Sequence, residues 1–205
     1  MKSLSDNSLD EALRARDPDR WLSSRFVGDA AQRARLVALY TLDGEWAHVA
    51  GAVTAPLAGE IRFAWWSEAL ERFAGGGAAE HPAFSALGRE AASRLRPFLD
   101  QAIDARRSAL EDPAAGAAAK VALMLAAARL LDPSAPEEPV RKVAQAWPDT
   151  PDLLTAANKA LRALPVAAFP AVAHATLAHA YARDGKPGAL EKRLRITWAV
   201  LTGRL

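Results

Sequence analysis

The sequence predicts an all-α protein with a single domain. Alanine is frequent, residues branched at Cβ are sparse, and no segment alternates apolar and polar residues as a half-buried strand does. Proline and glycine concentrate between segments in which apolar residues recur three and four positions apart, the spacing of one helix face. The chain of 205 residues is long enough to bury one core, so we expect one domain over residues 1–205.

Local signals mark where the helices begin and end. Prolines in a first turn and acidic residues before them mark starts, and glycines mark ends. The expected helices cover residues 6–16, 17–27, 30–53, 56–74, 82–95, 97–111, 114–131, 140–147, 152–164, 166–181 and 187–204. The proline-rich stretch 132–139 is the expected hinge. The segment 114–131 is nearly all apolar, so we expect it to be the central, enclosed helix of a bundle.

Apolar spacing also predicts which helix faces are buried. In the segment 30–53 the expected stripe includes Leu36, Leu39, Leu42, Trp46 and Val49. In the segment 56–74 the apolar residues at steps of four are Leu57, Ile61, Trp65 and Ala69. The adjacent residues Trp65 and Trp66 cannot share one helix face, so we expect one ring in the core and the other at a rim or interface.

Composition and charge exclude several classes of protein. The formal net charge is only +2, without the concentrated basic face that nucleic acid requires, so no nucleic-acid partner is expected. The absence of Cys excludes disulfides and thiolate metal sites. No run of 18 apolar residues suggests a membrane span, and the N-terminal residues lack the apolar core of a secretory signal. We therefore expect a cytoplasmic protein, with a position peripheral to the inner membrane as the alternative.

Four segments resemble the squalene/phytoene synthase family. They are Asp-Arg-Trp-Leu-Ser-Ser-Arg-Phe at 19–26, Ala-Leu-Tyr at 38–40, Pro-Leu-Ala-Gly-Glu-Ile-Arg at 56–62, and Pro-Phe-Leu-Asp-Gln-Ala-Ile-Asp-Ala-Arg-Arg at 97–107. The third is most similar to a divergent branch that includes bacterial proteins and the mitochondrial complex I assembly factor 6. The resemblance implies a shortened, isoprenoid (terpenoid) synthase-like helical bundle.

The family's chemistry depends on two aspartate-rich motifs on facing helices, which hold Mg²⁺ against a diphosphate. Carboxylates four residues apart share a helix face, and Mg²⁺ prefers oxygen ligands. In the register of the resemblance, the first motif falls on Ala47, His48 and Gly51, and the second has no counterpart after Val121. The leading hypothesis is therefore a non-catalytic relative without a cofactor, a binding or assembly protein that acts with a protein partner or near a membrane.

The alternative is a Mg²⁺-dependent prenyltransferase of squalene- or phytoene-type biosynthesis. It would need substitute carboxylates, for which the candidates are Asp43, Glu45, Asp100 and Asp104. Asp100 and Asp104 share one helix face and are the catalytic candidates, although Arg107 and Ser108 offer Asp104 ordinary helix pairing. Asp43 and Glu45 point to different faces, so a solvated or locally paired role is favoured for both.

A third hypothesis is a carrier that binds an isoprenoid lipid without chemistry. A cavity lined by Leu39, Trp46, Trp65 and Met124 and open at one end would support it. The substrate-binding candidates, expected to line the cavity of the family fold, are Tyr40, Trp46, Glu60, Arg62 and Trp65. The favoured interpretation of Glu60 is an ion pair with a buried Arg. His48 is expected to be a hydrogen-bonded core or rim residue, and His174 and His179 to be structural.

The C-terminal segment combines basic residues with an apolar stripe. The candidates for contact with a membrane or a partner are Lys192, Arg193, Arg195 and Trp198, and the stripe consists of Leu190, Leu194, Trp198 and Leu201. Such a helix can lie on an anionic bilayer. We favour the prediction that the stripe closes the helical bundle, with Lys and Arg in solvent.

Overall fold

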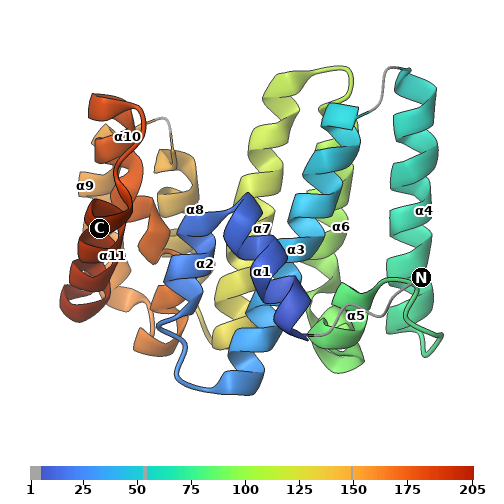
Figure 1. Ribbon diagram of the computed structural model, residues 1–205, viewed down its shortest axis with the longest axis horizontal. Coiled ribbons are helices and arrows are strands. Elements are labelled where there is room, and N and C mark those ends of the chain that lie inside the picture. The colour runs from blue at the N-terminus through green and yellow to red at the C-terminus, as the bar shows by residue number, and fades with distance from the viewer. Residues whose placement is uncertain (1–5, 53–54, 149) are drawn as a thin grey trace.

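The computed structural model describes residues 6–52, 55–148 and 150–205, and over these residues the regular elements are helices (Figure 1). The all-α prediction is therefore confirmed. In chain order the α-helices are α1 Asp6–Arg16, α2 Pro18–Ser24, α3 Ala30–Ala52, α4 Pro56–Ala74, α5 Pro82–Leu87, α6 Arg89–Ser108, α7 Gly116–Leu131, α8 Glu137–Ala146, α9 Leu154–Ala160, α10 Ala178–Asp184 and α11 Ala189–Thr202. Short 3₁₀ helices are η1 Pro113–Ala115, η2 Pro151–Leu153, η3 Leu161–Ala163, η4 Val166–Ala171 and η5 Ala173–Leu177.

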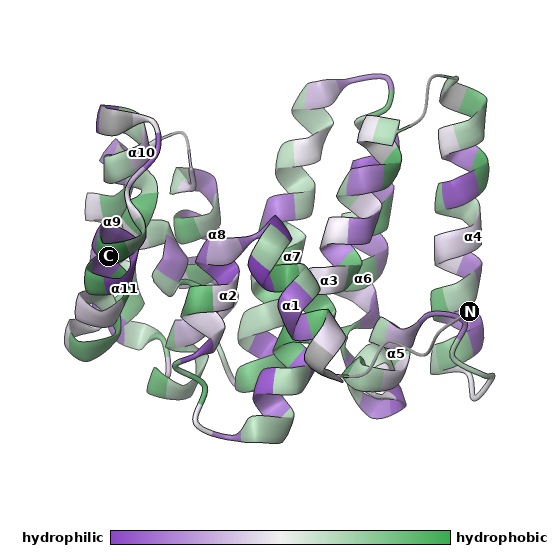
Figure 2. Ribbon diagram, in the orientation of Figure 1, coloured by the Kyte–Doolittle hydropathy of each residue, from purple (hydrophilic) through white to green (hydrophobic). Residues whose placement is uncertain are grey.

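Helix α7 lies at the centre, as the sequence predicts. It packs against α3, α6, α8 and η4, and its side chains from Ala122 to Ala128 are all buried. Together with η1 it forms a helical stretch, Pro113–Leu131, that is long and apolar enough to cross a membrane, and 56% of its apolar 18-residue window is buried inside the molecule. Packing within the bundle accounts for the apolar sequence of α7 (Figure 2).

The remaining helices extend to both sides of α7 (Figure 1). Helices α3 and α6 lie beside it, α4 forms one end of the molecule, and α9, α10 and α11 form the other. The predicted stripe of α3 is confirmed, because Leu36, Leu39, Leu42 and Trp46 are fully buried. Tyr40 and Asp43 lie on the side of α3 that faces α1, α2 and α6.

The predicted helix break at Pro97 is wrong. Pro97 lies inside α6, and the break falls instead at Gly88, between α5 and α6, where φ is 82° and ψ is 144°. Glycine adopts this conformation without the steric cost that a Cβ would bring. Pro97 has no N–H group to donate to the carbonyl oxygen of Ser93, one turn earlier. Both residues are exposed, so the proline is tolerated. Leu95 and Leu99, on the opposite side of α6, stay buried.

Two other predicted helices are divided into shorter pieces. Residues 166–181 form η4, η5 and the start of α10, because Pro170 lacks an N–H donor and its carbonyl oxygen accepts a hydrogen bond from Ser23 at 2.5 Å. Residues 152–164 divide into the end of η2, then α9 and η3. The predicted hinge is shorter than expected, since α8 begins at Glu137.

The predicted buried face of α4 is also wrong. Leu57, Ile61 and Trp65 are 71%, 62% and 39% exposed, and only Ala69 of that stripe is buried. The core face instead carries Phe63, Trp66, Leu70 and Phe73. Trp66 packs edge-on against Trp46 and Phe84, so the neighbouring aromatic rings decide which apolar stripe turns inward. Trp66 is therefore the core ring and Trp65 the rim ring of the predicted pair.

The favoured prediction for α11 is wrong, because the helix buries the face opposite to the one expected. The stripe expected to close the bundle is exposed, with exposed fractions of 70% for Leu190, 63% for Leu194, 68% for Trp198 and 76% for Leu201. The buried side carries the smaller Ile196 and Ala199. Lys192, expected in solvent, turns inward to Asp19 of α2, and this ion pair holds the charged side of the helix against the bundle.

Candidate functional site

The candidate site is a pocket of about 580 Å³ between α1, α2, α3, α6 and the turn after α8. Its wall includes Ala47, His48 and Gly51, the positions at which the resemblance places the first aspartate-rich motif. Two carboxylates, Asp17 and Asp43, line it as well. Four basic side chains also line it, namely Arg16, Arg20, Arg106 and Lys120. The pocket therefore contains more cationic than anionic groups.

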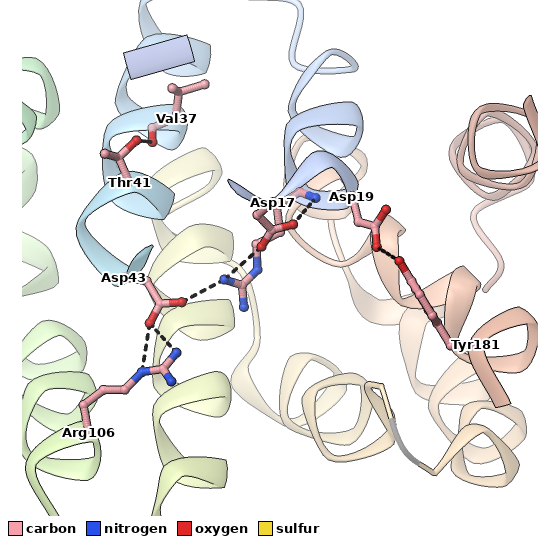
Figure 3. Close-up of polar contacts among 8 residues, drawn as sticks. Asp17, Asp19, Val37, Thr41, Asp43, Arg106 and Tyr181 are labelled. Atoms are coloured by element: carbon pink, nitrogen blue, oxygen red, sulfur yellow. Dashed lines mark hydrogen bonds and ion pairs between the residues drawn. The ribbon is translucent and has the colours of Figure 1, made fainter. Parts of the chain in front are cut away.

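Asp43 lies between two arginines from different helices (Figure 3). Its Oδ2 accepts a hydrogen bond from Nη1 of Arg20 at 2.8 Å, and its Oδ1 accepts from Nη2 of Arg106 at 2.8 Å. The Asp43 side chain is only 5% exposed. The prediction of a solvated or locally paired Asp43 is thus wrong, because the partners come from α2 and α6. We call this group the Arg20–Asp43–Arg106 bridge.

Arg20 is held by charge on both sides. Asp17 caps the N-terminus of α2 by accepting from the backbone N–H of Arg20 at 3.0 Å, and its other oxygen lies 3.6 Å from the guanidinium group. Burial alone would lower the pKa of Arg20, but the nearby carboxylates of Asp17 and Asp43 raise it above its usual value. Both carboxylates of the pocket are therefore engaged with cations.

Tyr40 contributes a polar group that the protein does not satisfy. Tyr40 lines the pocket and is 2% exposed, and its buried hydroxyl group has no hydrogen-bond partner among the described residues. Burial raises the pKa of the hydroxyl above its usual value, so it stays protonated at neutral pH and can donate a hydrogen bond. The guanidinium group of Arg20 lies over the ring, 5.3 Å from its centroid.

The structure does not bring the four candidate metal ligands together. Glu45 pairs with Arg16 at 2.7 Å, Asp100 with Arg96 at 3.2 Å, and Asp104 with Arg107 at 3.3 Å, all in partly exposed positions. Asp43 belongs to the Arg20–Asp43–Arg106 bridge. Among residues 6–52, 55–148 and 150–205, no group of three His, Asp or Glu side chains is arranged to hold a metal ion.

The substrate-binding candidates are also separated from one another. Tyr40 lines the candidate pocket, whereas Trp46 is fully buried in the core. Arg62 and Trp65 line another hollow of about 420 Å³, together with Glu45 and the exposed His48. Glu60 lies 3.9 Å from Arg107, which is 42% exposed rather than buried as expected.

A second polar cluster lies beside the pocket, on the other side of Trp147. The hydroxyl group of Tyr181 donates to Oδ2 of Asp19 (Figure 3). The Nζ atom of Lys192 donates to the Tyr181 hydroxyl at 2.6 Å and lies 2.7 Å from Oδ1 of Asp19. This cluster joins α2, α10 and α11. It connects the helices behind the hinge to the N-terminal part of the chain.

Sequence reasoning missed Arg20, Arg106, Asp19 and Tyr181 as partners in these clusters. A signal for three of them was present, because Asp19 and Arg20 lie in the segment 19–26 and Arg106 in the segment 97–107, both of which carry the family resemblance. Pairing between them could not be read from spacing, since Arg106 and Asp43 are 63 residues apart.

Comparison with known proteins supports the resemblance. A family model described as squalene/phytoene synthase matches residues 13–119, which is more than half of the chain. This stretch includes the Arg20–Asp43–Arg106 bridge and every residue of the pocket except Ala12, Lys120, Trp147 and Pro148. No curated protein and no solved structure matches the chain. The chain belongs to the squalene/phytoene synthase family.

Proposed function

We propose that this protein is a non-catalytic member of its family, a binding or assembly protein that keeps the helical bundle and a ligand pocket. The observation that carries the proposal is the Arg20–Asp43–Arg106 bridge. It occupies the pocket wall next to Ala47, His48 and Gly51, where the family resemblance would place metal-binding carboxylates. An aspartate already neutralised by two guanidinium groups is a poor ligand for Mg²⁺.

The charges around the pocket support the same conclusion. Arg16, Arg20, Arg106 and Lys120 would repel a divalent cation and attract an anionic group. Arginine recognises phosphate and carboxylate oxygens directly, through fixed N–H donors and without a metal. The Tyr40 hydroxyl adds a donor that has no protein partner among the described residues. We therefore propose that the pocket holds the anionic end of a ligand without a bound metal.

The proposed assembly role rests on the resemblance of residues 56–62 to the divergent branch. Helix α4, which contains this segment, exposes Leu57 and Ile61 at one end of the molecule. Exposed apolar residues on such a helix are compatible with a protein partner.

The catalytic alternative is tested by pyrophosphate release. Purified protein is incubated with farnesyl or geranylgeranyl diphosphate, with and without Mg²⁺, and we expect no release in either case. Release that requires Mg²⁺ and disappears in Asp100→Asn and Asp104→Asn would overturn the proposal and establish a prenyltransferase with relocated ligands.

The binding role is tested by calorimetric titration of farnesyl diphosphate in the absence of metal. We expect binding that Tyr40→Phe weakens about fivefold, because this change removes one hydrogen bond and leaves the ring in place. Tyr181→Phe is the matched control, since Tyr181 lies outside the pocket wall. Equal affinities for the wild type and Tyr40→Phe would show that the hydroxyl group does not contact the ligand. Absence of any heat of binding would argue against a prenyl diphosphate as the ligand.

A further inference from the structure

Helix α11 presents an apolar face to solvent. Leu190, Leu194, Trp198 and Leu201 follow one another at steps of four, four and three, so their side chains lie on one side of the helix. Each is at least 63% exposed. We call these four residues the α11 stripe. A soluble helix normally turns such a stripe toward a core, and here the opposite side of the helix does so through Ile196 and Ala199.

A basic groove continues the α11 stripe at its C-terminal end. The groove has a volume of about 910 Å³ and runs between α9, η3, η4 and the end of α11, with Leu201 and Val166 in its wall. Val166 is 88% exposed. Among the described residues that line the groove, the charged side chains are all basic, namely Lys159, Arg162 and Arg204. We call this feature the basic groove.

The C-terminal part of the chain, which contains α11, is also richer in basic residues than the rest. Residues 181–205 contain six Lys and Arg against two Asp and Glu, whereas the whole chain contains 26 against 24. Glu191, the acidic residue of α11, pairs with Arg195 at 2.8 Å and lies 3.5 Å from Arg183, while Arg193 beside the stripe is exposed. The surface around the α11 stripe therefore carries an excess of positive charge.

We propose that the α11 stripe and the basic groove together bind the surface of an anionic lipid bilayer. Leucine and tryptophan side chains on one side of a helix enter the boundary between headgroups and acyl chains, and nearby Lys and Arg attract anionic lipid. Trp198 carries the ring type that is enriched at this boundary. The inference concerns the opposite end of the molecule from α4 and does not depend on the pocket or its ligand.

The arrangement of charge favours a bilayer over a second copy of the chain. A two-fold dimer through the α11 stripe would bring together two copies of a surface that carries an excess of positive charge and would offer the basic groove no anionic partner. A bilayer containing anionic lipid offers a continuous negative surface to the groove and an apolar layer to the stripe. Both features of α11 are then satisfied by one partner.

The test is flotation of the full chain with vesicles of phosphatidylcholine and with vesicles that also contain phosphatidylglycerol. We expect binding to the anionic vesicles that falls as salt increases. Leu194→Ser and Trp198→Ser should each weaken it on the order of tenfold, because each removes a large apolar side chain from the bound face. Arg162→Gln combined with Arg204→Gln should reduce the preference for phosphatidylglycerol.

Helix α4 supplies the matched control. Leu57→Ser and Ile61→Ser each remove an apolar side chain that is about as exposed as those of the α11 stripe. Acidic residues outnumber basic ones in α4, with Glu60, Glu68 and Glu71 against Arg62 and Arg72. The two variants should therefore leave vesicle binding unchanged. Failure of the wild-type chain to float with anionic vesicles would overturn the proposal. So would equal losses in the α4 and α11 variants. A dimer that Leu194→Ser dissociates, without vesicle binding, would identify a second copy as the occupant instead.

Discussion

Asp43 of α3 and Arg106 of α6 are 63 positions apart in the sequence, and their side chains meet at 2.8 Å. With Arg20 on the other oxygen, the carboxylate connects three helices at the wall of the candidate pocket. A buried charge that loses its partner is strongly destabilising, whereas an exposed pair contributes little. The bridge is therefore expected to matter for stability as well as for the chemistry that the pocket can perform.

Asp43→Asn should lower the free energy of unfolding by about 3–5 kcal/mol, because it removes the carboxylate that Arg20 and Arg106 share and leaves Arg20 only the more distant Asp17. Urea unfolding followed by circular dichroism measures the change. Glu45→Gln is the control, since Glu45 and Arg16 form a partly exposed pair for which we expect a loss of about 0–1 kcal/mol. Similar losses for both variants would show that Asp43 is not held as a buried charge.

Trp46→Ala should destabilise the protein by about 3–5 kcal/mol, because its fully buried ring would leave a cavity against Trp66. Trp65→Ala should cost only about 1 kcal/mol, since the ring is 39% exposed and loses chiefly its edge contact with Trp66. Denaturant midpoints of the two variants provide the comparison. A larger loss for Trp65→Ala would mean that α4 is rotated relative to the arrangement described.

His174 should make the protein sensitive to mild acid. It is buried, neither ring nitrogen has a hydrogen-bond partner among the described residues, and burial, aided by the charge of Arg20, holds its pKa well below 6.5. Below pH 6.5 the unfolded chain binds a proton at this residue and the folded chain does not. Stability should therefore fall as the pH decreases, by about 1.4 kcal/mol per pH unit from this group.

The measurement is unfolding free energy against pH, for the wild type and for His174→Phe, which keeps a ring edge-on to Trp147. We expect the variant to show a shallower acid slope. His48→Asn, which replaces an exposed histidine, serves as the control substitution. An unchanged slope in His174→Phe would assign the acid sensitivity to other groups.

Gly88→Ala should destabilise the protein by about 1–3 kcal/mol, because the residue would have to adopt φ of 82° between α5 and α6. No atom lies within 4 Å of the position of the added Cβ, so backbone strain is the expected cause. Pro97→Ala should cause no loss, since Pro97 lies on the exposed side of α6. Thermal unfolding of both variants tests whether the helix break lies at Gly88; the reverse order of stability would place it at Pro97.

Much of the fold could be predicted from local signals. Pro18, Pro56 and Pro82 each begin a helix, and the apolar segment that contains α7 became the central helix. Local signals failed where two breakers competed, as at Gly88 and Pro97. They also failed where a helix carried two apolar stripes, as α4 does, because the choice between stripes depends on which neighbour is present to pack against.

The candidate site could be predicted only in part. The resemblance places the first aspartate-rich motif at Ala47, His48 and Gly51, and in the structure all three residues lie in the pocket wall. It did not indicate that Arg20 and Arg106 would neutralise Asp43, because residues far apart in sequence acquire partners only when their helices pack. The same limit explains why Lys192, expected in solvent with Arg193, instead faces Asp19 and Tyr181.

By itself, the sequence determined that this chain is helical, where most of its helices begin, and which family it belongs to, because these follow from backbone preferences and from short segments of residues. The tertiary structure decided which face of α4 is buried, which distant charges are paired, and that the α11 stripe faces outward. Those outcomes depend on free energies of contact between segments distant in the chain, and local patterns do not contain them.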